Sequence, residues 1–333
     1  MIKYNFTSDL RISSLKEAIS SAAKNIANDT VGLLDKSGQN NTATLSFYFN
    51  LKSKTNTLDL ALRGDVTQVI RNFVIKFQYP NPYTMDLLKA QIEDHTIIAP
   101  LRAICRLLIF WSFLEPTENT FLTYDEIRYY IFCNPDMWIN SDVDFVKSII
   151  DKIKSGRVSE VDYTSNIKQL LDWKQHERQS RELIMTITYA SNCFTISKGC
   201  LYFSMPNILD RSFSDEMKFI SNLISFNNYW SCGVEEIQKA NESYIEYMDI
   251  KGTIQLSAKQ IVRALSSDDF PLQQIYFGAP GTGKSHDINE VCAEYENYRT
   301  TFHPDTDYAS FVGSYKPITQ EVEMRDLAGH KVS

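Results

Sequence analysis

Residues 278–285 read Gly278-Ala279-Pro280-Gly281-Thr282-Gly283-Lys284-Ser285. This string matches the pattern G-x-x-x-x-G-K-[ST] of loops that hold nucleotide phosphates. An apolar run precedes it at 275–277, and residues 286–298 can form a helix, which together supply the strand, loop and helix that the motif requires. The glycines would turn backbone N–H groups toward phosphate oxygens. Lys284 would neutralise the β- and γ-phosphates, and Ser285 would ligate Mg²⁺.

The sequence after this loop is short. Only 48 residues follow Ser285 (333 − 285), and no apolar strand ending in Asp or Glu occurs in 318–333. A hydrolytic P-loop core needs such an acidic strand to hold Mg²⁺ and position water. We therefore expect the chain to be the front part of a longer protein, and catalytic residues stay unassigned.

Composition places the chain among ordinary globular proteins. Its 333 residues predict two or three domains, and the net charge of −7 means that any nucleic-acid contact must come from a local patch. The six cysteines lack C-x-x-C spacing, which disfavours zinc and indicates reduced thiols. No signal core begins the chain, and arginines interrupt the longest apolar stretch at 99–113. We expect a cytoplasmic protein without membrane contact.

The first region, 1–120, has mainly helical periodicity. Residues 13–27 show the apolar spacing of an amphipathic helix. A turn is expected at 37–41, followed by a strand at 42–51, where apolar residues alternate. Further helices are predicted at 66–77, 87–92 and 100–114.

The second region, 121–255, begins with a helix start. Thr123 and Glu126 form a predicted capping box for a helix at 124–132. Helices at 143–154 and 163–173 follow, and then come strand-like runs at 183–189, 193–196 and 200–203. Three helices followed by a small hairpin resemble a winged helix. Two more helices are expected at 213–225 and 235–248.

One segment of this second region is basic. Residues 147–181 hold eight Lys and Arg against five Asp and Glu, a net charge of +3. Lys152, Lys154 and Arg157 are the candidates for contacts with DNA phosphates. A solvated helical face in a packing module explains the same charges, and we favour that interpretation over DNA contact.

A second motif follows the P-loop. The strings FGAPGTGKS at 277–285 and TTFHPDTDYASFVGSYKP at 300–317 together resemble the AAA+ NTPase domain of McrB-type restriction proteins. That family carries T-F-H-x-x-x-x-Y-x-x-F-[VI]-x-x-x-[KR]-P after its first P-loop helix. The matching positions here are Thr301, Phe302, His303, Tyr308, Phe311, Val312, Lys316 and Pro317.

The resemblance implies a fold and an activity. The fold would be mixed α+β: a mainly helical N-terminal region with a winged-helix-like segment, followed at 256–333 by the start of an incomplete α/β P-loop (AAA+) domain. The complete protein would be a homo-hexameric motor of a DNA-restriction or phage-defence system. It would bind and hydrolyse ATP or GTP with Mg²⁺, act on DNA and drive a McrC-like nuclease subunit, whereas this chain alone would not turn over nucleotide.

Two rival hypotheses remain open. One is a nucleotide-switched DNA- or protein-binding module without turnover. The other is a small P-loop kinase or transferase, which the long leader and the element at 303–317 disfavour.

Overall fold

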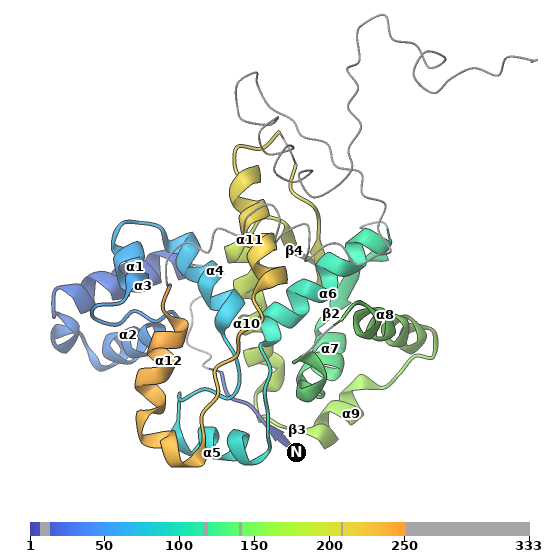
Figure 1. Cartoon of the computed structure of the whole chain (residues 1–333), viewed down its shortest axis with the longest axis horizontal. Coiled ribbons are helices and arrows are strands. Elements are labelled where there is room, and N and C mark those ends of the chain that lie inside the picture. The colour runs from blue at the N-terminus through green and yellow to red at the C-terminus, as the bar shows by residue number, and fades with distance from the viewer. Residues whose placement is uncertain (7–13, 116–118, 140–141, 208, 251–333) are drawn as a thin grey trace, which may run out of the picture. The chain divides into compact units, whose positions relative to one another are not determined.

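The computed structural model describes residues 1–250 except 7–13, 116–118, 140–141 and 208, all within one compact unit, Met1–Gln273. Helices dominate the described residues, and two small sheets lie among them (Figure 1). The α-helices are α1 (Leu15–Ala27), α2 (Lys36–Tyr48), α3 (Asn56–Leu62), α4 (Val66–Lys76), α5 (Met85–Glu93), α6 (Pro100–Leu114), α7 (Tyr124–Ile127), α8 (Val143–Val158), α9 (Tyr163–Leu170), α10 (His176–Ala190), α11 (Phe213–Ser225) and α12 (Ala240–Met248).

Short helical turns and strands complete the order. The turns are η2 (Val31–Leu33), the π-helix η4 (Arg128–Phe132), η5 (Pro135–Trp138) and η6 (Val234–Lys239). The strands are β1 (Ile2–Lys3), β2 (Phe121–Thr123), β3 (Leu171–Asp172), β4 (Phe194–Ser197) and β5 (Cys200–Phe203). The mainly helical, mixed α+β fold class is therefore confirmed, whereas the predicted start of an AAA+ domain at 256–333 lies outside the described residues.

Helix α2 replaces the predicted turn at 37–41 and strand at 42–51. Its first turn is capped by Asp35, whose Oδ1 accepts a hydrogen bond from the backbone N–H of Gly38 at 2.8 Å. The apolar alternation was a misleading signal, because the side chains buried here recur at helical spacing. They are Thr42, Leu45, Ser46 and Tyr48.

Helix α10 contains the run at 183–189 that was predicted to be a strand. That run is rich in β-branched residues, which favour strands in isolation. In the fold α10 packs against both α4 and α6, and Leu183, Ile184 and Ile187 are fully buried (Figure 1). Packing of this face outweighs the weak local propensity.

The hairpin of β4 and β5 confirms the other two predicted strands. Its two turn residues, Lys198 and Gly199, have φ angles of 50° and 78°, the left-handed pair that a two-residue hairpin turn requires. Strand β2, which was not predicted, pairs with the other side of β5, so the antiparallel order is β2-β5-β4. The winged-helix-like arrangement is not confirmed, because one expected strand is helix and the sheet begins before the helices.

The capping box at the start of α7 is confirmed. Thr123 Oγ1 accepts a hydrogen bond from the Glu126 N–H at 3.2 Å, and Glu126 Oε2 accepts one from the Thr123 N–H at 2.8 Å. The α-helix lasts only one turn, after which the chain continues as the π-helix η4.

One hydrophobic core runs through the described unit. Phe73 of α4, Trp111 of α6 and Ile184 of α10 are completely buried in it, together with Leu122 of β2. Elements before and after residue 120 thus share one core, and the division into 1–120, 121–255 and 256–333 stays a prediction. Among the described residues, no helix is long and apolar enough to cross a membrane. The cytoplasmic location stays a prediction.

Candidate nucleic-acid interface

The three-stranded sheet has one buried and one solvent-facing side. Leu122, Leu201 and Phe203 point into the core, as alternation along a strand requires. The residues between them are part-exposed or exposed, and we name this side the outer sheet face. It consists of Phe121, Thr123, Thr195, Ser197, Cys200 and Tyr202.

An aromatic pair lies on the outer sheet face. Phe121 of β2 is directly opposite Tyr202 of β5, with ring centroids 5.5 Å apart. Tyr202 has Thr195 opposite it on β4, and Cys200 and Ser197 form the next pair along the strands. Thr195 and Ser197 are exposed, and Tyr202 is part-exposed beside them.

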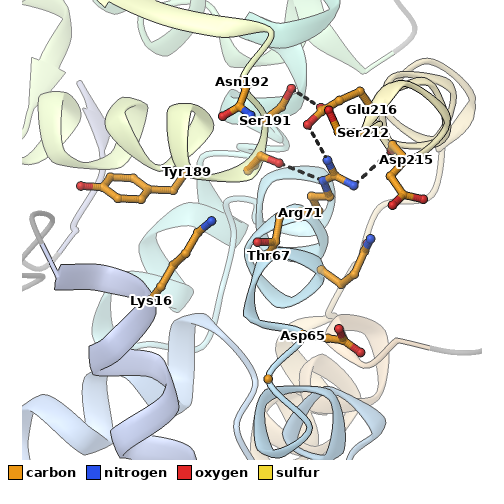
Figure 2. Close-up of a pocket in the computed structure, with 13 residues that line it drawn as sticks. Lys16, Asp65, Thr67, Arg71, Tyr189, Ser191, Asn192, Ser212, Asp215 and Glu216 are labelled. Carbon is orange, nitrogen blue, oxygen red and sulfur yellow. Dashed lines mark hydrogen bonds and ion pairs between the residues drawn. The ribbon is translucent and has the colours of Figure 1, made fainter. Parts of the chain in front are cut away.

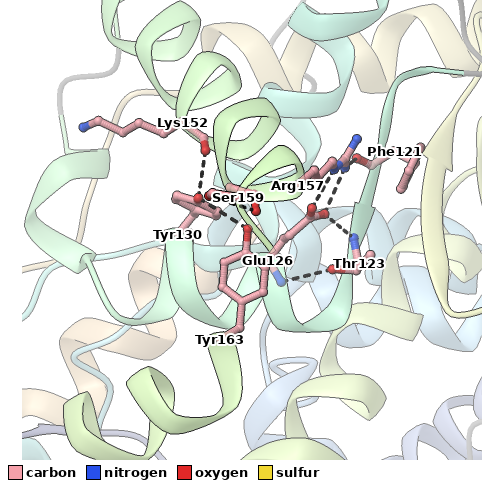
Figure 3. A network of polar contacts seen from close by, with 9 residues as sticks. Phe121, Thr123, Glu126, Tyr130, Lys152, Arg157, Ser159 and Tyr163 are labelled. Carbon is pink, nitrogen blue, oxygen red and sulfur yellow. Dashed lines mark hydrogen bonds and ion pairs between the residues drawn. The ribbon is translucent and has the colours of Figure 1, made fainter. Parts of the chain in front are cut away.

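Arg157 of α8 borders this face and is held by a carboxylate (Figure 3). Its Nε lies 2.6 Å from Oε1 of Glu126, and its Nη2 lies 2.9 Å from Oε2. Nη2 also donates to the Phe121 carbonyl at 2.7 Å, while the guanidinium lies 4.0 Å from the Phe121 ring centroid and 5.3 Å from that of Trp111. The cation is therefore held by Glu126 and contacts two rings.

A second cation borders the other end of the face. The Arg181 guanidinium of α10 lies 5.5 Å from the ring centroid of Tyr124, the residue that follows β2. Burial raises the pKa of the Tyr124 hydroxyl, although Arg181 and Arg128 oppose this effect. Arg128 itself is engaged in the fold through Asp125 at 2.5 Å and the Ser180 hydroxyl at 2.9 Å.

Exposed cations also occur just before α10, on α10 and at the hairpin turn. We name them the basic row: Lys174, Arg178, Arg181 and Lys198. Arg178 has only a loose pair with Glu182 at 3.6 Å, and its side chain is 60% exposed. Within the described part of the chain, the other three make no ion pair, so their charges face solvent.

The three predicted phosphate-contacting residues have different roles. Arg157 is paired with the buried Glu126, and Lys154 is paired with Glu115. Lys152 is exposed, and its carbonyl accepts a hydrogen bond from the Tyr130 hydroxyl at 2.9 Å. The net charge of 147–181 therefore overstates the free positive charge, since two of the three cations stabilise the fold.

Sequence reasoning missed the aromatic pair and Lys198. Strand β2 has only three residues, too few for its alternation to give a signal, and the pairing of Phe121 with Tyr202 joins segments 81 positions apart (202 − 121). The turn at Lys198-Gly199 was predicted, but the contact between α10 and β4 depends on tertiary packing.

A polar cleft of about 350 Å³ lies elsewhere, between α4, the end of α10 and the start of α11 (Figure 2). At its base Arg71 Nη2 lies 2.9 Å from Glu216 Oε1, and Arg71 also donates to the Ala190 and Asp215 carbonyls at 2.8 and 3.1 Å. Glu216 in turn accepts a hydrogen bond from the Ser191 hydroxyl at 2.5 Å. These contacts join three helices, so we interpret the cluster as structural.

The predicted nucleotide site, Gly278–Ser285 with Ser285 as metal ligand, lies outside the described residues and stays a prediction. In the part of the chain that the structure describes, no group of three or more His, Cys, Asp or Glu side chains could hold a metal ion.

Comparison with known proteins gives the family. The profile of the family described as "Restriction endonuclease BpuJI - N terminal" matches residues 40–243, more than half of the chain. The chain belongs to this restriction endonuclease family. The match includes the whole outer sheet face and the basic row. No curated protein matches the chain.

One solved structure has a similar fold. It is titled "Crystal structure of pyrene- and phenanthrene-modified DNA in complex with the BpuJ1 endonuclease binding domain". The TM-score is 0.51 at 13% sequence identity, and the similarity covers 73% of this chain and 94% of that chain. This result shows a shared fold for the region that carries the family match.

The family overturns the resemblance to McrB-type AAA+ NTPases. Because the chain belongs to a restriction endonuclease family, the predicted AAA+ NTPase activity is wrong, and so are ATP or GTP with Mg²⁺ as cofactors. The homo-hexamer and the McrC-like nuclease subunit rested on the same resemblance and find no support. The resemblance rested on residues 275–317. A short loop pattern indicates local geometry, but it does not determine the function of the region before it.

Proposed function

We propose that the described region binds duplex DNA as a recognition part of a restriction system. Membership of the restriction endonuclease family supports this proposal, as does the fold shared with a domain whose title names a DNA complex. Of the earlier alternatives, the proposal keeps a DNA-binding module without nucleotide turnover.

The basic row is the observation that carries the proposal. The chain has a net charge of −7, yet it presents exposed positive charge on Lys174 just before α10, on Arg181 of α10 and on Lys198 in the hairpin turn. Such a local cluster is what binding to a phosphate backbone requires. In this proposal α10 would lie along the DNA, and the turn at Lys198 would reach its backbone.

The test is a titration of the full 333-residue chain against labelled duplex DNA at several salt concentrations. A variant with Lys174→Ala, Arg178→Ala and Arg181→Ala should bind all duplex sequences more weakly. Each lost phosphate contact should reduce the slope of log affinity against log salt by about 0.9. We expect a decrease in the slope of about 2 to 3 for the triple variant.

The matched control removes three exposed cations from the N-terminal elements: Lys24→Ala, Arg63→Ala and Lys89→Ala. It lowers the net charge equally and should leave the salt slope almost unchanged. Equal losses in the two variants would mean that total charge matters and the basic row does not. No binding by the parent chain at about 50 mM salt, where even non-specific contacts are measurable, would overturn the proposal.

A further inference from the structure

The outer sheet face differs from the basic row in its chemistry. The aromatic pair Phe121 and Tyr202 forms one end of the face, with Arg157 beside Phe121, and Arg181 lies beside Tyr124, which follows the other end of β2. Duplex DNA presents phosphates and groove edges, so it offers no base face to an exposed ring. Aromatic rings between cations are typical of surfaces that bind unpaired nucleotides.

Arg157 supports the aromatic pair. Its guanidinium lies 4.0 Å from the Phe121 ring centroid and 5.3 Å from that of the buried Trp111, and the Phe121 and Tyr202 rings lie 5.5 Å apart at an interplanar angle of 38°. Arg157 is positioned by the buried Glu126, so the support of Phe121 is in place before any ligand arrives (Figure 3). A preformed platform loses little conformational entropy on binding.

The charge around the platform suits a polyanion. None of the six residues of the outer sheet face is acidic. Glu126 is neutralised by Arg157 and Asp125 by Arg128. The exposed cations Arg181 and Lys198 would attract the phosphates on both sides of a stacked base.

We propose that the outer sheet face binds an unpaired nucleotide of DNA, with its base stacked on Tyr202 and its flanking phosphates near Arg181 and Lys198. This inference rests on the proposed DNA binding and specifies a substrate feature, a single-stranded or extrahelical segment. The basic row would hold the duplex, and the platform would hold a base that has left the stack.

The experiment compares three labelled DNAs with the full chain: a single strand, its duplex, and the duplex with one extrahelical 2-aminopurine. Tyr202→Ala should weaken binding to the single strand and to the extrahelical DNA about tenfold, the typical loss for one stacked base. The duplex affinity should stay within about twofold, because phosphate contacts supply most non-specific affinity. Quenching of the 2-aminopurine fluorescence on binding should disappear in the same variant, whereas Tyr202→Phe should keep it.

A second variant is independent of the aromatic side chain. Thr195→Glu places a negative charge directly opposite Tyr202 at an exposed position. It should lower affinity for the single strand more than Ser148→Glu does, a matched change at an exposed position of α8.

The results separate this inference from the proposed function. Binding of the duplex without any preference for unpaired bases, or equal losses on all three DNAs in Tyr202→Ala, would overturn the platform and leave duplex recognition intact. A chain that binds none of the three DNAs would overturn both proposals. If this face bound a protein and the 2-aminopurine fluorescence did not change when the chain was added to the extrahelical DNA, the platform would also be rejected.

Discussion

Individual polar side chains hold this fold together over long sequence separations. Arg71 and Glu216, both buried, connect α4 to α11, and Ser191 adds the end of α10. A buried charge that loses its partner remains desolvated without compensation. The pair therefore makes the packing of these helices specific and sensitive to single changes.

The first prediction concerns this ion pair. Glu216→Gln should lower the free energy of unfolding by about 3 kcal/mol, because it leaves the buried Arg71 cation uncompensated. Adding Arg71→Met to that variant should cost much less than Arg71→Met does in the parent, which a double-mutant cycle from urea unfolding measures. The control is Lys218→Gln, which removes an exposed pair with Asp215 at 3.7 Å and should change stability by about 0.5 kcal/mol or less. Strict additivity of the two buried substitutions would contradict the expected coupling.

Between elements, close approach depends on a helical glycine. Gly156 of α8 faces the hydroxyls of Tyr130 from η4 and Tyr163 from α9, which lie 3.4 Å apart (Figure 3). A Cβ at this position would lie 2.5 Å from the Tyr163 hydroxyl and 2.7 Å from that of Tyr130. The absent side chain thus lets three helical segments meet.

The second prediction tests this contact. Gly156→Ala should destabilise the fold by about 1 kcal/mol, since overpacking costs about 1–3 kcal/mol and exceeds the helix-propensity gain of about 1 kcal/mol. Adding Tyr163→Phe removes the closer hydroxyl and should recover part of the loss. Thermal unfolding of the two variants measures the effect, with Ser155→Ala at the exposed neighbouring position as control. Stabilisation by Gly156→Ala would mean that the tyrosines move aside easily.

Across the whole molecule, burial keeps several weakly acidic groups protonated. Burial raises the pKa of the Cys133 thiol to about 12 and holds that of the Cys105 thiol well above its ordinary value of 9.0. The pKa values of the Tyr4, Tyr79 and Tyr244 hydroxyls are also raised well above 10.0 by burial. The unfolded chain loses these protons at a lower pH than the folded chain does.

The third prediction follows from that difference. Stability should be unaffected by these groups below about pH 9 and should fall as pH rises from about 9 toward 12, because the unfolded state binds fewer protons there. Arg106 acts in the opposite direction, since burial and then Arg102 lower its pKa to about 10, and burial also lowers the pKa values of Lys52 and Arg128. The thiols and hydroxyls whose pKa values are raised outnumber these cations. The urea midpoint should decrease between about pH 8 and pH 10.5, and less steeply in Cys133→Ala. A midpoint that is constant or rises over this range would contradict the prediction.

The sequence by itself determined the features that depend on neighbouring residues. The bounds of α6 and α11, the capping box of Thr123 and Glu126, and the hairpin turn at Lys198 were all predictable, because caps, turns and helical periodicity act within a few positions. The same local reasoning assigned an activity from the P-loop pattern, and the family match at 40–243 corrected it.

Tertiary structure decided what local signals could not. Helices α2 and α10 replaced predicted strands, because burial at helical spacing outweighed alternation in one and β-branched composition in the other. Tertiary structure also decided which cations are engaged in the fold and which face solvent. Arg157 is held by Glu126, 31 residues away, while Arg181 lies over the Tyr124 ring and is exposed. Residues so far apart in the sequence come together only when the core forms. The free energy of burying the core then selects one arrangement from the many that the local sequence allows.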